Sequence, residues 1–152
     1  MMSRGVALLL ALVVQPGCAD APPLDRPTGG RVAEAGAYDE DGRRTGAWTT
    51  LRPDGSKERT YTWLAGGKHG SWAAWDAEGH KTLSGSYRVG NKDGSWWDWY
   101  LNGRPKELTT WDRGRPGGPA VKWHEDGDLA QVGHYTDGAK VGLWLAWHEV
   151  GG

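Results

Sequence analysis

The chain has 152 residues, enough for one domain of ordinary size, and it contains 25 glycines, 11 tryptophans and no phenylalanine. Lysine and arginine number 18 against 19 aspartates and glutamates, so the formal net charge is −1. This near-neutral balance excludes the strongly basic surface that is typical of nucleic-acid-binding domains, and we expect no nucleic-acid partner.

Residues 1–17 have the features of an export signal. Arg4 supplies a positive charge, and the apolar run that follows, GVALLLALVV (5–14), is too short to span a bilayer. Two cleavage sites compete. The segment ADA (19–21) has the small-x-small pattern of an ordinary signal-peptidase site, but Pro22 would then follow the cut. The segment QPGC (15–18) resembles a bacterial lipoprotein box with Cys18 as the acceptor.

Cys18 is the only cysteine, so an internal disulfide is excluded. Its position, at the end of the signal and before the Pro-rich segment ADAPPLDRPTGG (19–30), favours lipidation over a spare thiol that leaves with the signal. We therefore expect a signal peptide of lipoprotein type at 1–17, a linker at 18–30 and a folded domain at 31–152. The expected location is the bacterial cell envelope, with a lipid anchor at the outer membrane or its periplasmic face.

The region after the linker repeats itself every 24 residues. One glycine series consists of Gly42, Gly66, Gly90, Gly114 and Gly138, and another of Gly46, Gly70, Gly94, Gly118 and Gly142. Aromatic residues form three columns with the same spacing: Trp75, Trp99, Trp123 and Trp147; Trp48, Trp72, Trp96 and Trp144; Trp63, Tyr87, Trp111 and Tyr135. Five copies in one register predict a stack of equivalent structural units.

Each unit is predicted to be a β-hairpin. Pairs such as Asp54-Gly55 and Asn102-Gly103 favour a type I′ turn, in which both central residues need positive φ. No segment between glycines is long enough to repay helix nucleation. The G-x-x-x-G segments are interpreted as connections between units.

The predicted fold is all-β: an elongated, single-layer antiparallel sheet of repeated hairpins, roughly 45 Å long at the usual strand spacing. We place strands near 31–38, 47–52, 57–63, 71–76, 81–87, 95–100, 105–111, 119–124, 129–135 and 143–148. With no second layer to pack against, large indole rings must supply the core themselves. Trp72 and Trp75 are three residues apart, so either a bulge resets the strand or both faces carry aromatic residues.

The pattern G-x-x-x-G-x-W-x-x-W-x-x-x-G, best seen in GGKHGSWAAWDAEG (66–79) and GNKDGSWWDWYLNG (90–103), resembles the MORN repeat (membrane occupation and recognition nexus). It is most similar to the bacterial variant of YwqK-type proteins, commonly described as antitoxins, and it covers about residues 38–152. The resemblance implies a scaffold with no shared catalytic residues. The fourth copy departs from it, because Ala120 replaces a tryptophan and Pro119 precedes it. Since proline cannot donate a ladder hydrogen bond, we expect a bulge or a locally exposed edge there.

Two surfaces are candidate binding sites. The first is an aromatic interaction face, made of Trp72, Trp75, Trp96, Trp99, Trp123 and Trp147. The second is a basic ridge suited to anionic lipid headgroups or an acidic partner, made of Arg43, Arg44, Lys68, Lys92, Arg115 and Lys140. The alternatives are that the tryptophans are covered as core and that the cations keep the sheet edges soluble.

No group of residues suggests catalysis, a cofactor or a metal ion. The five histidines include His124 and His148, which share one repeat position and are expected roughly 10 Å apart, too far to bind one zinc ion directly. The G-x-x-x-G segments lack the G-K-[ST] ending of a phosphate-binding loop. We therefore expect a protein that is not an enzyme.

Three functions are compatible with these features. The favoured one is a non-catalytic envelope lipoprotein that presents its sheet to a protein partner or serves as a structural scaffold. The resemblance adds an antitoxin or immunity-type protein that neutralises a toxin. The third is a module that binds a small molecule, such as a glycan, a cation or an anionic lipid headgroup.

Overall fold

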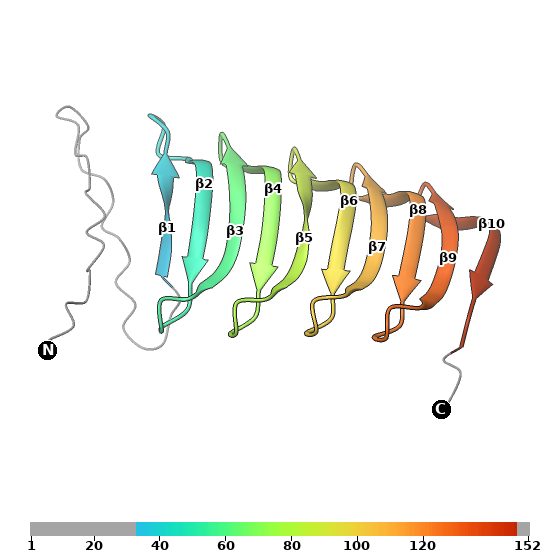
Figure 1. Ribbon diagram of the computed structural model, residues 1–152. Helices are drawn as coiled ribbons and strands as arrows, with labels where there is room; N and C mark the ends of the chain where they lie inside the picture. The colour runs from blue at the N-terminus through green and yellow to red at the C-terminus, as the bar shows by residue number, and fades with distance from the viewer. Residues whose placement is uncertain (1–32, 149–152) are drawn as a thin grey trace, which may run out of the picture.

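A computed structural model describes residues 33–148, and in this part of the chain the fold is a single open sheet without helices (Figure 1). Its ten strands lie side by side in chain order, and each is antiparallel to the next. This confirms the predicted all-β, single-layer sheet of repeated hairpins. Within these residues there is accordingly no helix with the length and hydropathy needed to cross a membrane. The expected signal peptide, linker and Cys18 lie outside the described residues.

The strands alternate between two kinds within each unit. The odd-numbered strands are β1 (Ala33–Tyr38), β3 (Lys57–Leu64), β5 (Lys81–Arg88), β7 (Pro105–Asp112) and β9 (Leu129–Thr136). The even-numbered strands are β2 (Arg44–Leu51), β4 (Gly67–Trp75), β6 (Asn91–Trp99), β8 (Arg115–Trp123) and β10 (Ala139–Ala146). The even strands begin earlier than predicted, inside the G-x-x-x-G segments. These segments are therefore the start of a strand and not a separate connection.

The type I′ turns lie at a different place from the one predicted. Among residues 33–148, the only non-glycine residues with positive φ are Ala65, Val89, Arg113 and Asp137. Each is followed by a glycine that also has positive φ. Two successive residues with positive φ define the two-residue I′ hairpin. These turns therefore connect each odd strand to the following even strand from β3 onwards.

The Asp-Gly and Asn-Gly segments form longer loops. The N–H of Arg52 donates to the carbonyl oxygen of Ser56 over 2.8 Å, and the N–H of Gly55 donates to that of Arg52 over 2.9 Å. Gly55 has positive φ and Asp54 does not, as in a type I turn followed by a left-handed glycine. The Asp54 carboxylate accepts the backbone N–H of Ser56, and Asn102 and Asp126 do the same for the residue two positions on.

A bulge bends every even strand near its middle. Ala35 pairs with Thr49 and Ala37 pairs with Thr45, so residues 46–48 of β2 together oppose Gly36 of β1. The second glycine series occupies this bulge in every unit, with φ between 63° and 122°. Bulges bend and twist a strand, and Figure 1 shows the strands curving near one end. Of the two outcomes expected at Pro119, a bulge or a locally exposed edge, the structure has the bulge, and it is common to all units.

The core is a line of indoles inside this curve. Trp48 and Trp96 are 3% and 4% exposed, although the sheet has one layer. Each lies against a glycine of the preceding odd strand: a Cβ added to Gly36 would be 2.1 Å from the ring of Trp48, and one added to Gly85 would be 2.3 Å from that of Trp96. The sheet thus buries its indoles by closing the bent strand over a position that has no side chain.

Neighbouring units are also joined at both ends of their strands, at the I′ turns and at the longer loops. The glycine of each I′ turn donates its N–H to an even strand of the previous unit, over 2.8–3.0 Å: Gly66 to Arg44, Gly90 to Lys68, Gly114 to Lys92 and Gly138 to Pro116. At the opposite ends of the strands, side chains of the longer loops contact a backbone carbonyl oxygen of the next unit: Arg52 to Trp75, Tyr100 to Trp123 and His124 to Trp147. Each unit is therefore held by its two neighbours, as expected for a repeat stack.

Candidate functional site: the two faces and the open ends of the sheet

The predicted aromatic interaction face is divided between the two sides of the sheet. Trp96 and Trp97 belong to a regularly paired stretch, opposite Thr109 and Leu108, so their side chains point to opposite faces. The ring of Trp72 lies 5.5 Å from that of Trp96, on what we call the first face. Trp99 stacks against Trp97, on the second face. Of the two alternatives left open by the sequence, the structure has aromatic residues on both faces.

The first face carries a line of cations over aromatic rings. The ammonium group of Lys92 lies 4.2 Å from the ring centre of Trp96 and 4.5 Å from that of Trp111. The equivalent cations make the same kind of contact: Arg44 over Trp48 and Trp63, Lys68 over Tyr87, and Lys140 over Trp144. Burial lowers the pKa of Lys92. The charge over these rings is thus partly removed from water, and a cation–π contact is stronger when the cation is desolvated.

The predicted basic ridge is therefore not one surface. Four of its members are the strand cations that cover the rings of the first face: Arg44, Lys68, Lys92 and Lys140. The guanidinium of Arg44 also pairs with Glu34 over 2.6 Å. Burial alone would lower the pKa of Arg44, but the charge of Glu34 raises it. Arg43 lies in the first turn, paired with Asp39 and Asp41, and Arg115 opens β8 one residue before the cation position.

The second face carries stacked indoles that are only half buried. The ring of Trp97 is 6.2 Å from that of Trp99 and 6.0 Å from that of Trp123, with interplanar angles of 21° and 14°. Trp75 holds the position of Trp99 one unit earlier, and Lys57 lies over its ring. Trp147 follows β10 and is 43% exposed. Trp97, Trp99 and Trp123 form what we call the second-face stack, and Trp75 and Trp147 hold the positions equivalent to Trp99 and Trp123 in the units before and after it.

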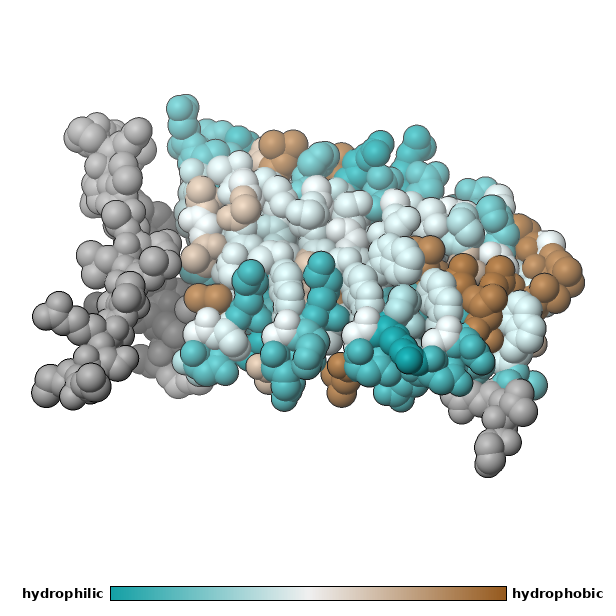
Figure 2. All heavy atoms as spheres, in the orientation of Figure 1, coloured by the Kyte–Doolittle hydropathy of each residue, from teal (hydrophilic) through white to brown (hydrophobic). Residues whose placement is uncertain are grey.

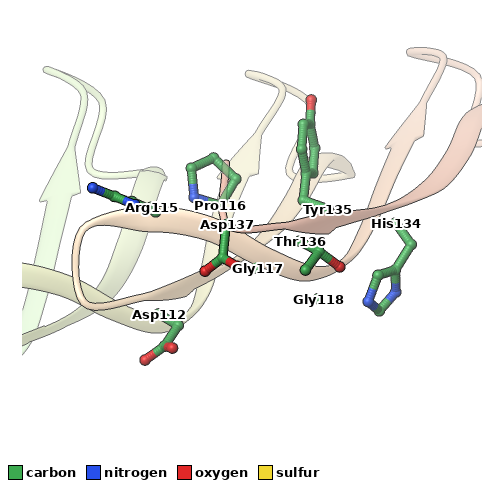
Figure 3. A pocket seen from close by; sticks show the side chains of 9 residues that line it. All are labelled: Asp112, Arg115, Pro116, Gly117, Gly118, His134, Tyr135, Thr136 and Asp137. Atoms are coloured by element: carbon green, nitrogen blue, oxygen red, sulfur yellow. The ribbon is translucent and has the colours of Figure 1, made fainter. Parts of the chain in front are cut away.

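The fourth unit lacks both the indole and the cation that form the cation–π contacts of the first face. Ala120 stands in the tryptophan column and is 4% exposed, while Pro116 stands where the other even strands have a cation. An open hollow lies beside Pro116, and Figure 3 shows its lining side chains pointing in different directions, with Tyr135 and His134 on opposite sides. The lining consists of Asp112, Arg115, Pro116, Gly117, Gly118, His134, Tyr135, Thr136 and Asp137. The carboxylates and the imidazole do not converge on a common point.

Apolar side chains gather at the C-terminal end of the sheet, on the strand β10 and beside it. Figure 2 shows this concentration of hydrophobic residues over β9 and β10. Leu143 is 76% exposed and Leu145 is 45% exposed, and Val141 is also exposed. One side of β10 pairs with β9, and among residues 33–148 no strand pairs with its other side. The sequence placed the terminal strand of the sheet here, but Leu143 and Leu145 were not among the predicted site residues.

Polar chemistry is sparse in the described part of the chain. Residues 33–148 contain no group of three or more His, Cys, Asp or Glu side chains placed to hold a metal ion. The imidazole Nε2 of His124 lies 3.0 Å from the carbonyl oxygen of Trp147, and His80 pairs with Asp76 over 3.2 Å. The first contact joins the loop between β8 and β9 to the segment after β10, and the second lies within the loop between β4 and β5.

Comparison with known proteins leaves the fold as the main guide to function. No protein-family model matches the chain, and no curated protein matches it significantly. The resemblance to the MORN repeat therefore stays a prediction from the motif itself. What the structure adds is the geometry of the repeat: a hairpin with a bulge, a buried indole line and a half-buried indole stack.

Proposed function

We propose that this protein is a non-catalytic, MORN-like scaffold of the bacterial cell envelope that binds a protein partner on the second face of its sheet. The observation that carries the proposal is the second-face stack, in which Trp97 contacts both Trp99 and Trp123. Rings held in mutual contact lose little side-chain freedom on binding, and tryptophan is enriched among residues that dominate interface energies.

The charges beside the stack favour a partner with acidic groups around an apolar centre. Lys57 and Lys81 lie 5.2 and 5.8 Å from the ring centres of Trp75 and Trp99. A partner that places carboxylates at the rim would pair with these exposed ammonium groups, while apolar side chains would cover the rings. Aromatic centres with polar rims are usual in protein–protein interfaces.

The anchor in this proposal is Cys18, on the basis of the export signal and the lipoprotein-box pattern. A Cys18→Ser variant is expected to move from the membrane fraction to the soluble fraction of the cell envelope. Equal membrane association of the variant and the parent protein would contradict the lipid anchor. This test is independent of the one for the partner.

The partner test is affinity capture of the membrane-anchored protein after cross-linking in cells, with mass spectrometry as the measurement. We expect one protein to be captured by the parent and lost when Trp97 and Trp123 are both replaced by Thr. A matched variant, Lys68→Ala with Lys140→Ala, alters only the first face and is expected to retain the partner. Circular dichroism must first show that both variants keep the sheet. Retention by the tryptophan variant, or loss from the lysine variant alone, would refute the second face as the binding surface.

A further inference from the structure

The two ends of the described sheet are complementary to each other. Inside the sheet, each even strand pairs on its far side with the next odd strand in one constant register: Gly46 with Trp63, Gly70 with Tyr87, Gly94 with Trp111 and Gly118 with Tyr135. In the part of the chain that the structure describes, β10 is an even strand without a following odd strand, and β1 is an odd strand without a preceding even one. The register that joins internal units can therefore be extended from β10 to a second β1.

The extended register brings matching side chains together on the first face. It places Gly142 opposite Tyr38 and Trp144 opposite Gly36 of a second copy. Inside the sheet, Trp72 is opposite Gly85 in this register, and the ring of Trp96 covers the same glycine from the other side. The two rings then meet over the glycine, 5.5 Å apart.

The same arrangement is half present at the N-terminal end. The ring of Trp48 covers Gly36, which leaves no room for a Cβ, just as Trp96 covers Gly85. In the internal unit, Trp72 reaches Gly85 from the preceding even strand. The equivalent side of Gly36 is the side of β1 that faces away from β2, where no described strand lies. Trp144 of a second copy would lie there, and it would meet Trp48 over Gly36 as Trp72 meets Trp96 over Gly85.

The cations follow the same rule. Each internal cation lies over the aromatic ring of the next odd strand: Arg44 over Trp63 at 5.5 Å, Lys68 over Tyr87 at 5.2 Å and Lys92 over Trp111 at 4.5 Å. Lys140 holds this position on β10, and within residues 33–148 it has no ring of a following strand to cover. Tyr38 holds the ring position on β1. Pairing β10 with β1 would supply Lys140 with that ring.

Covering the outer side of β10 would also bury exposed apolar side chains. Leu143 and Leu145 project from a strand whose outer backbone groups have no partner in the described chain. An exposed apolar edge strand is a template for pairing with another chain. The facing residues of β1 in the extended register are Ala37 and Ala35, whose small side chains leave space for the two leucines.

We propose that β10 of one molecule pairs antiparallel with β1 of a second copy, so that the sheet continues from one molecule to the next. The contact joins two different surfaces, so it leaves a free β1 and a free β10 at the ends and generates open chains unless a rotation closes them. Each added molecule would lengthen the sheet by roughly 48 Å, at ten strands per copy. This inference does not depend on the partner or on the anchor proposed above.

The test uses single cysteines placed opposite each other by the extended register, Ala35→Cys and Leu145→Cys. Each is introduced into the full chain with Cys18→Ser, so that it is the only thiol. We expect the two proteins, mixed and oxidised, to form a disulfide-linked dimer of one with the other, and neither protein to cross-link with itself. Thr60→Cys is the matched control, because Thr60 holds the position of Ala35 on an internal strand. Its mixture with Leu145→Cys is expected to stay uncross-linked.

Other cross-linking patterns would overturn the proposal. If the Leu145→Cys protein cross-linked with itself, two β10 strands would be paired with each other. If the Ala35→Cys protein cross-linked with itself, two β1 strands would be paired. Sedimentation velocity of the cysteine-free parent provides a second measurement. Its sedimentation coefficient is expected to rise with protein concentration, and that of a Leu143→Lys, Leu145→Lys variant is expected not to. A parent protein that stays monomeric at all concentrations would refute the proposal.

Discussion

At the scale of the residue, glycine is as important as tryptophan in this protein. Trp96 is buried in a one-layer sheet only because Gly85, on the neighbouring strand, has no side chain beneath the ring. The ring then contacts backbone on one face and Trp72 beside it. The core is thus specified by a pair of residues, one very large and one without a side chain, that face each other across two strands.

Replacing Gly85 with alanine is therefore expected to destabilise the fold. The added methyl group would lie 2.3 Å from the Trp96 ring, so the indole or the strand must move. We expect the free energy of unfolding to fall by about 1–3 kcal/mol, the usual effect of overpacking. Urea unfolding followed by tryptophan fluorescence measures this change.

Gly67→Ala is the control for this measurement, because its nearest contact is an ordinary 3.6 Å to the carbonyl oxygen of Leu64 and its φ is not positive. It is expected to change stability much less than Gly85→Ala. Equal effects of the two substitutions would show that glycine matters for the backbone and not for the fit against Trp96.

At the scale of the element, the sequence predicted the hairpins correctly but assigned the I′ turns to the wrong segments. Asp54-Gly55 resembles an I′ pair, yet the same two residues also suit a type I turn that ends in a left-handed glycine. The carboxylate of Asp54 favours the latter, because it accepts the N–H of Ser56. Three of the four true I′ turns start with Ala65, Val89 or Arg113, which carry no turn signal, and only the fourth, Asp137-Gly138, has an Asp-Gly pair. Only their regular spacing before a glycine could have indicated the first three.

Val89 is the least suitable of these turn residues. It has a φ of 48° and is 79% exposed, and left-handed backbone is strained for a β-branched side chain. Val89→Asn is expected to raise the free energy of unfolding by about 1 kcal/mol, because asparagine tolerates this conformation and is preferred in I′ turns. Thermal or urea unfolding of the full chain would measure it.

The equivalent turn residue Asp137 provides the comparison, since aspartate already tolerates a φ of 50°. Asp137→Asn is expected to change stability by only a few tenths of a kcal/mol. If Val89→Asn had no larger effect than Asp137→Asn, backbone strain at Val89 would not limit the stability of the turn.

At the scale of the whole molecule, the period of the sequence identified which residues are equivalent but not where they lie. The columns that begin with Trp48 and with Trp75 were both predicted, yet their burial was not. Trp48 and Trp96 of the first column are buried under the bend at the bulge, whereas no member of the second column is buried. That bend depends on a glycine with positive φ inside a strand, such as Gly70, which a simple alternation pattern does not reveal. The cations likewise formed one ridge in the sequence, although Arg44 covers rings and Arg43 pairs within a turn.

The fourth unit is expected to form a weak junction in the stack, between β7 and β8. A repeat stack is stabilised mainly by contacts between neighbours, and its units can open locally. β8 contributes Ala120 and Pro116 where β2 contributes an indole and a guanidinium, so the last three strands are joined to β7 without these contacts. β2 and β9 are each second from an end of the described sheet, which makes them a matched pair.

Hydrogen exchange measured by mass spectrometry is expected to show faster exchange in β9 than in β2, by on the order of tenfold, equivalent to about 1.4 kcal/mol in local opening. The difference should shrink when the indole at the N-terminal end is removed by Trp48→Ala, because that substitution weakens the joint at β2 in the same way. Equal exchange of β2 and β9 in the parent protein would mean that backbone pairing, and not the indole and cation contacts, determines where the sheet opens. The units would then be equally stable despite their unequal side chains, and the fourth copy would be a tolerated variant of the repeat.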